Sequence, residues 1–161
     1  MIKWLMLFVV FCGSLTGCGC QDKNGGLTGE QDRIRAQQAA IREVIRQDKA
    51  IGEEVGQKVG VVEQYWDSSP LVREIAARMD AIDLSGCPQD FQIAYKRHVF
   101  AWASMAQVKA SNEGLNGFLK GFFTGGLAAI PAMSEVESAA KQIQATWLEV
   151  QETAIKHGVT P

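Results

Sequence analysis

Apolar residues recur with a helical period along the first half of the chain. From about Thr28 to Trp66 they stand three or four positions apart, a spacing that gathers them on one face of an α-helix. The other faces carry charges of both signs, among them Glu54 and Lys58 in the favourable order four residues apart. We therefore predict one long amphipathic helix, whose inward residues are Ile34, Ile41, Val44, Ile45, Ile51, Val55, Val59, Val62 and Trp66.

Two shorter helices are predicted next. Ser69 can cap the second helix and Pro70 suits its first helical position, so we expect a helix over residues 70–84. A further break precedes the third helix, which we expect over residues 89–112. The inward stripes are Val72, Ile75, Met79 and Ile82 in the second helix, and Phe91, Tyr95, His98, Trp102 and Met105 in the third.

The clearest helical pattern lies near the end of the chain. Ser134 and Glu137 have the spacing of a capping box, and Gly158 is typical of the residue that ends a helix. The inward residues between them are Val136, Ala140, Ile143, Trp147, Val150 and Ala154. Residues 114–130 are apolar and glycine-rich, and we expect them to be helical as well. No segment alternates strictly between apolar and polar residues, so the sequence predicts an all-α antiparallel bundle of four to five helices.

Glycines recur at every fourth position in two of these segments. One set is Gly52, Gly56 and Gly60, and the other is Gly117, Gly121 and Gly125. Each set forms a flat ridge on one helical face, which favours close packing of helices within the bundle. An alternative for residues 114–130 is a hairpin that touches a membrane through Phe118, Phe122 and Phe123.

The N-terminal residues have the order of features found in an export signal. Lys3 precedes an apolar run, Trp4–Cys12, which is far shorter than the ~20 residues of a membrane span. The run is followed by Leu15-Thr16-Gly17-Cys18, which resembles the lipobox of bacterial lipoproteins. The resemblance implies cleavage before Cys18 and anchoring by acyl chains, such as palmitate, on that cysteine. Gly19 at the next position then suggests the outer membrane, facing the periplasm, over the inner membrane.

This interpretation divides the chain into three parts. Residues 1–17 are the signal peptide, residues 18–29 a lipidated flexible tether, and residues 30–161 the helical bundle domain. Cleavage leaves 144 residues, enough for one domain with a core, and changes the net charge from −2 to −3 because Lys3 is removed. A small net charge with both signs mixed along the chain is not typical of nucleic-acid binding. The expected partners are the membrane and an envelope protein.

The chain has four cysteines. Cys12 is removed with the signal peptide and Cys18 is the lipidation site, which leaves two others. Cys20 and Cys87 could form a disulfide in an oxidising compartment, or Cys87 could be buried and unpaired. Cys87 precedes a predicted helix N-terminus, where the helix dipole would lower a thiol pKa. No histidine is close enough along that helix to activate it, so we expect a structural role.

Candidate chemistry is sparse elsewhere. The chain has two histidines and no metal-binding or catalytic motif, so we expect no enzymatic activity, no metal and no cofactor. The segment from Cys87 to Trp102 loosely resembles small bacterial envelope proteins of unassigned activity. Within it Tyr95, His98 and Trp102 could line a ligand pocket, or His98 could be a core histidine with a hydrogen-bond partner.

The sequence accordingly favours a non-catalytic envelope lipoprotein with a structural or protein-interaction role. The alternatives are a ligand- or cofactor-binding bundle that uses the stripe of Tyr95, His98 and Trp102, and a protein that touches the membrane through residues 114–130.

Overall fold

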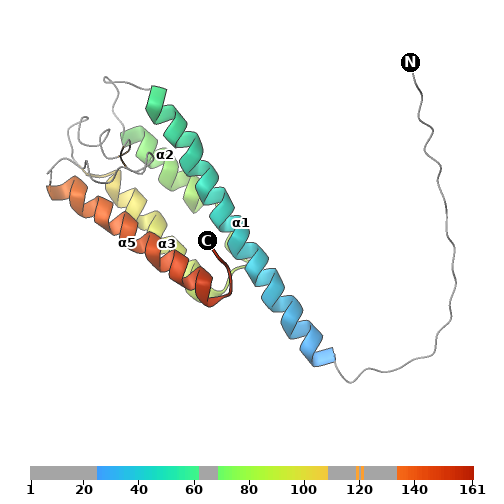
Figure 1. Cartoon of the computed structure of the whole chain (residues 1–161). Coiled ribbons are helices and arrows are strands. Elements are labelled where there is room, and N and C mark those ends of the chain that lie inside the picture. The colour runs from blue at the N-terminus through green and yellow to red at the C-terminus, as the bar shows by residue number, and fades with distance from the viewer. Residues whose placement is uncertain (1–24, 62–68, 109–118, 120, 122–133) are drawn as a thin grey trace, which may run out of the picture.

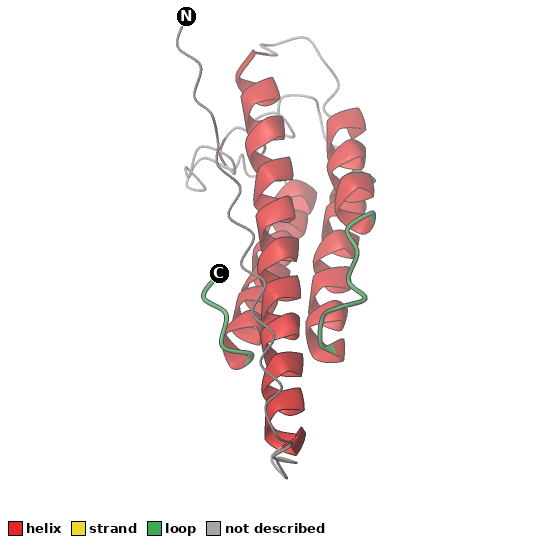
Figure 2. Ribbon diagram, turned by 90° about the vertical axis from the view of Figure 1, so that its right-hand side faces the viewer, coloured by secondary structure: helices red, strands yellow, loops and turns green. Residues whose placement is uncertain are grey.

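The predicted all-α antiparallel bundle is confirmed. The structure is a computed structural model, and it describes residues 25–61, 69–108, 119, 121 and 134–161 (Figure 1). These residues contain helices and no strand, as Figure 2 also shows. The helices are α1 (Gly25–Val61), α2 (Ser69–Asp80), α3 (Gln89–Met105) and α5 (Ser134–Lys156).

Helices α1 and α2 run antiparallel, and charged side chains join their outer faces. Arg78 on α2 binds Glu54 on α1 at 2.6 Å. One turn later in α1 and one turn earlier in α2, Lys58 binds Glu74 at 3.2 Å. Lys58 also binds Glu54 at 3.0 Å, which confirms the predicted pair four residues apart. All four side chains are about one third to one half exposed, so each pair contributes at most about 1 kcal/mol.

The most extensive packing among the described helices is between α3 and α5. These two helices are also antiparallel, since Asp90 near the start of α3 meets Lys156 at the end of α5 at 2.7 Å. Helix α2 also packs on α3, whereas α1 has fewer close approaches to α3 and α5 than those two helices have to each other. This looser approach of α1 leaves room for the pocket described below.

The core is formed by the predicted apolar stripes. The five predicted inward residues of α3 are all buried, and the largest side chains with no exposure include Phe91, Tyr95 and Met105. The prediction is wrong for Ile34, whose side chain is 42% exposed. Ile34 lies in the N-terminal part of α1, which extends beyond the ends of the other described helices (Figure 1).

Several helix boundaries differ from those predicted. Helix α1 includes residues 25–29, which we had predicted to belong to the flexible tether because they are rich in glycine. Helix α2 ends at Asp80, four residues early, because Asp83 forms a local turn by accepting hydrogen bonds from the backbone and hydroxyl of Ser85. Helix α3 ends at Met105, where the backbone changes to bonds three residues apart, as from Gln107 to Ser104.

The end of α5 is fixed by Gly158, as predicted. Gly158 has a φ of +75°, a left-handed conformation that favours glycine. Its N–H donates to the carbonyl of Ile155, and that of Val159 donates to Ala154, which is the Schellman arrangement. The side chain of Gln38 on α1 donates to the adjacent carbonyl of His157 at 3.0 Å, so the end of α5 is attached to α1.

Three predictions concern residues outside the described ranges. The signal peptide, Cys18 and Cys20 belong to residues 1–24, and the proposed membrane-touching hairpin, residues 114–130, is described only at Leu119 and Gly121. Leu119 is fully buried in the core. In the part of the chain that the structure describes, no helix combines the length and the hydropathy that a membrane span requires.

Candidate ligand pocket

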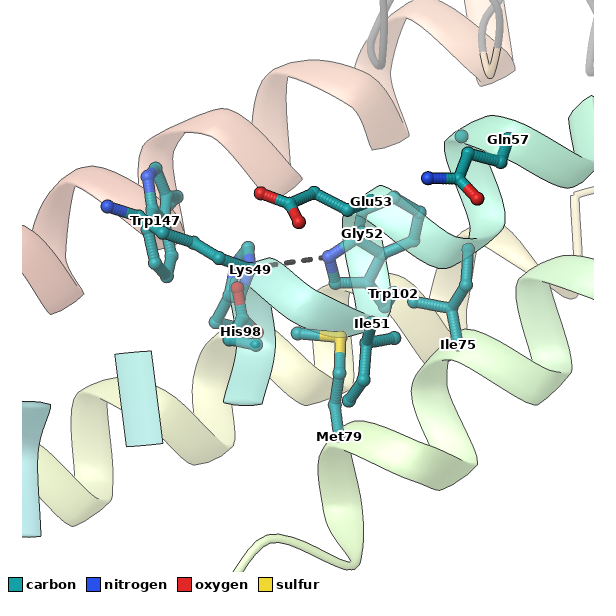
Figure 3. A pocket seen from close by; sticks show the side chains of 12 residues that line it. Lys49, Ile51, Gly52, Glu53, Gln57, Ile75, Met79, His98, Trp102 and Trp147 are labelled. Carbon is teal, nitrogen blue, oxygen red and sulfur yellow. Dashed lines mark hydrogen bonds between the residues drawn. The ribbon is translucent and has the colours of Figure 1, made fainter. Parts of the chain in front are cut away.

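A pocket of about 620 Å³ lies between all four described helices. Helix α1 forms one side, and α2, α3 and α5 supply the rest (Figure 3). Its volume falls in the range of ~300–1,000 Å³ that is common for small-molecule sites. The residues that line it are Asp48, Lys49, Ile51, Gly52, Glu53, Gly56, Gln57, Ile75, Met79, His98, Trp102 and Trp147. We call it the four-helix pocket.

His98 is held in this pocket by a chain of hydrogen bonds. The indole N–H of Trp102 donates to His98 Nε2 at 3.2 Å, so Nε2 is the unprotonated nitrogen. The other ring nitrogen, Nδ1, therefore carries the proton and donates to Thr146 Oγ1 at 3.0 Å. The Thr146 hydroxyl in turn donates to the carbonyl of Gln142, one turn earlier in α5, at 2.9 Å. The ring of Trp147 packs on the imidazole, with ring centroids 5.2 Å apart.

This environment keeps His98 neutral. Its side chain is only 3% exposed, and burial lowers the pKa of the imidazole to about 4. A second proton on Nε2 would also face the indole N–H of Trp102, and two donors cannot bond to each other. The expectation of a buried, hydrogen-bonded histidine is therefore confirmed, and the same residue lines the pocket.

Asp48 is the unusual polar residue of the pocket. Its Oδ1 accepts a hydrogen bond of 2.9 Å from the phenol of Tyr95, which is fully buried. Burial of the Asp48 carboxylate raises its pKa to about 6, against the smaller opposing effects of Tyr95 and Lys49. The Tyr95 pKa is raised as well, because the phenol is buried and lies beside Asp48. At neutral pH the pocket thus contains a poorly solvated carboxylate.

The remaining polar groups lie on the α1 side of the pocket. Lys49, Glu53 and Gln57 are all exposed, and Figure 3 shows the Glu53 carboxylate directed toward the side where Lys49 and Trp147 lie. The opposite walls are apolar, with Ile75 and Met79 contributed by α2. The pocket therefore combines an aromatic and aliphatic interior with charged groups along one side.

The three residues predicted as a ligand stripe have different positions. His98 and Trp102 line the four-helix pocket, whereas Tyr95 does not and instead positions Asp48 from behind. The predicted glycine ridge of α1 reaches the same place, since Gly52 and Gly56 form part of the wall. These two glycines therefore lie at the wall of the pocket, and close helix packing along this ridge stays a prediction.

Sequence reasoning missed Asp48 and did not assign Trp147 to the site. Asp48 lies on the inward stripe of α1, seven residues after Ile41 and seven before Val55, both of which are fully buried. An acidic residue in an apolar stripe is costly to bury, so this position was a detectable sign of a polar site. Trp147 was predicted as core, and only the tertiary structure places it against His98.

The structure corrects the expectation for the Cys87 thiol. Cys87 is a buried free thiol, and because Cys20 lies outside the described residues a disulfide between them stays a prediction. Burial, together with the nearby charge of Asp83, raises the Cys87 pKa to about 11, although the helix dipole was expected to lower it. The raised pKa leaves little of the thiol as the reactive thiolate at neutral pH.

His157 and Lys156 both contact Asp90 near the start of α3. His157 Nε2 lies 2.8 Å from Asp90 Oδ1, and Lys156 binds the other carboxylate oxygen. These contacts, with that of Lys156 the largest, lower the Asp90 pKa to about 2. Asp90 lies in the first turn of α3, as predicted, and its partners show that it attaches α5 to that turn. No group of metal-binding side chains occurs among the described residues.

Comparisons with known proteins give no relative for this chain. No family model, curated protein or solved structure matches it.

Proposed function

We propose that this chain is a lipid-anchored envelope protein whose helical bundle binds a small molecule in the four-helix pocket. The observation that carries the proposal is the combination of an open, largely apolar pocket with two tryptophans, a neutral histidine and a desolvated carboxylate. The anchor and the envelope location rest on residues 3–18, as derived from the sequence. We expect binding without turnover.

The polar arrangement of the pocket supports binding better than a purely structural role. A bundle gains stability by filling its interior with apolar side chains, and a carboxylate such as Asp48 among them costs stability. Gly52 and Gly56 each cost about 1 kcal/mol relative to alanine in a helix. Residues that reduce stability while they shape an open pocket are typical of ligand sites.

Filling the pocket tests the proposal. In Gly52→Leu the new side chain is introduced at the pocket wall, and leucine is a better helix former than glycine. We expect the variant to fold and to lose the small molecules that co-purify with the native protein, as measured by mass spectrometry of extracts. Gly29→Leu is the matched control, because Gly29 also lies on α1 and has nothing within 4 Å of its Cβ position. Equal ligand content in the two variants would contradict the proposal.

A protein-interaction role, the first expectation from the sequence, is the second candidate. It is favoured by the outer face of α3, where Phe100 is 67% exposed and Ile93, two turns earlier, is 46% exposed. Lys96 is exposed between them, so this face suits an envelope protein that presents an apolar surface beside an acidic group. Crosslinking in native membranes should then capture a partner protein with the natural chain and lose it in Phe100→Ser. The control Leu148→Ser, on α5, should keep that partner. If neither variant loses it, the outer face of α3 is not the interface.

A further inference from the structure

We infer that the four-helix pocket selects a ligand with an aromatic or aliphatic body and a cationic amine, which pairs with Asp48. The inference rests on the proposed ligand-binding function and specifies its chemistry.

Asp48 has acceptor capacity that the protein does not use. An ionised carboxylate offers about four lone-pair sites, and Tyr95 occupies one of them through Oδ1. No other hydrogen bond of Asp48 is found in the described part of the chain, and its side chain lines the pocket. An ammonium group would supply the missing donors, and its positive charge would compensate for the solvation that the carboxylate has lost.

The buried phenol of Tyr95 holds this carboxylate in place. Tyr95 is fully buried on α3, and its hydroxyl crosses from that helix to Asp48 on α1. The carboxylate is therefore oriented before a ligand arrives, which reduces the entropy lost on binding. Tyr95 acts here as a positioning residue, since it does not itself line the pocket.

The other charged groups of the pocket also favour a cation. The titratable lining residues are Asp48, Lys49 and Glu53 on α1 and His98 on α3, while α2 and α5 contribute apolar lining residues only. Two carboxylates outweigh the one ammonium, and Lys49 is exposed and can turn toward solvent. His98 stays neutral, because its Nε2 accepts the hydrogen bond from Trp102. The unprotonated Nε2 therefore offers no hydrogen-bond donor to an anionic ligand.

The apolar interior indicates the body of the ligand. The indole of Trp147 and the side chains of Ile75 and Met79 lie on walls other than that of Asp48. Such walls bind aromatic or aliphatic groups, and tryptophan faces also attract organic cations. The volume of about 620 Å³ accommodates a two-ring aromatic with a short amine chain.

Three probes with the same body separate the amine preference from binding itself. They are 2-naphthylethylamine, 2-naphthylethanol and 3-(2-naphthyl)propionate, titrated by calorimetry into the mature chain held in lipid nanodiscs, with empty nanodiscs as the blank. We expect the amine to bind at least tenfold more tightly than the alcohol, and the propionate to bind most weakly. Asp48→Asn should reduce the preference for amine over alcohol to less than threefold, because the amide keeps the Tyr95 bond but has no charge. Asp80→Asn, an exposed change of the same kind outside the pocket, should leave the preference unchanged.

Changing the pH provides a second measurement that does not depend on a variant. Because the Asp48 pKa is raised to about 6, lowering the pH from 7 to 5 protonates it and should weaken amine binding at least fivefold, without affecting the alcohol. If all three probes bind equally, the amine inference fails and the proposed function stands. If none binds, both fail. If the amine preference survives in Asp48→Asn, the assignment to Asp48 is wrong.

Discussion

Asp48 and His98 should make opposite contributions to the pH dependence of stability. Folding lowers the pKa of His98 from its ordinary 6.5 to about 4. Folding raises the pKa of Asp48 from its ordinary 3.8 to about 6. Near pH 5 the unfolded chain therefore carries a proton on the imidazole and none on the carboxylate. The folded protein has the reverse arrangement, so folding moves one proton from His98 to Asp48 with no net uptake.

The two effects have similar size. A histidine whose pKa is lowered by folding contributes stability that is complete above pH 6.5 and is lost as the pH falls toward 4, a loss of about 3 kcal/mol. A carboxylate whose pKa is raised by folding has the opposite effect, since stability falls by up to about 3 kcal/mol as the pH rises from 3.8 to 6. Between pH 4 and 6 these two contributions nearly cancel in the natural protein.

Asp48→Asn should remove one side of this balance. Asparagine resembles the protonated carboxyl, so the variant should match the natural protein in stability at pH 4 and exceed it by up to about 3 kcal/mol at pH 7. The measurement is urea unfolding of both proteins at half-unit pH steps, followed by circular dichroism. His98→Gln should show the complementary trend, with a destabilisation that becomes smaller by about 3 kcal/mol from pH 6.5 to 4.

The stability difference between variant and natural protein is the quantity to compare, because every other titratable group is present in both. Asp80→Asn, at an exposed position on α2, is the control for the loss of a carboxylate outside the pocket. A constant stability difference for Asp48→Asn between pH 4 and 7 would refute the claim that this carboxylate is desolvated. If Asp48→Asn is more stable than the natural protein at pH 7, the charged carboxylate in the pocket lowers the stability of the natural protein. Such a loss of stability is common at binding sites.

Three further predictions concern the rest of the chain. Gly158→Ala should lower the free energy of unfolding by about 1–2 kcal/mol, because alanine is strained at a φ of +75° and its Cβ would lie 2.9 Å from Gln38 Nε2; Gly29→Ala, in open space, should not destabilise the protein. With the other thiols replaced by serine, Cys87 should react with iodoacetamide at pH 8 roughly a hundredfold more slowly in the folded than in the unfolded protein, because its pKa is raised from 9.0 to about 11. Equal rates would show that the thiol is accessible. Cys18→Ser should abolish labelling by an alkyne analogue of palmitate and release the protein from membranes, and persistent labelling would contradict the lipobox interpretation.

Much of the architecture could be predicted from the sequence because it depends on local spacing. The period of apolar residues identifies which face of each helix is buried, and this is why the stripe from Phe91 to Met105 was predicted correctly. The end of α5 followed from Gly158, since a glycine after a regular stripe can adopt the left-handed conformation that stops a helix. The errors lie at helix ends such as that of α2, where a local bond from Ser85 to Asp83 competes with one more helical turn.

The candidate site could be predicted only in part. Periodicity placed His98 and Trp102 on one face of α3, and that proximity is a property of the helix itself. It could not supply Thr146, which is 48 residues away along the chain and accepts the hydrogen bond from His98 Nδ1. Nor could it show that Tyr95 reaches across to Asp48, because a period defines the buried face of one helix and not the residue it meets on another.

The sequence by itself thus determined the class of fold, the buried faces and the resemblance of the N-terminus to a lipoprotein signal. The tertiary structure alone decided that α1 stays further from α3 and α5 than those helices are from each other, so that Gly52, Asp48 and Trp147 border a pocket. The physical reason is that helix formation and burial depend on neighbours a few residues apart, whereas a cavity depends on the spacing of whole helices. That same spacing leaves Asp48 half-buried, bound by Tyr95 on one side and facing the pocket on the other.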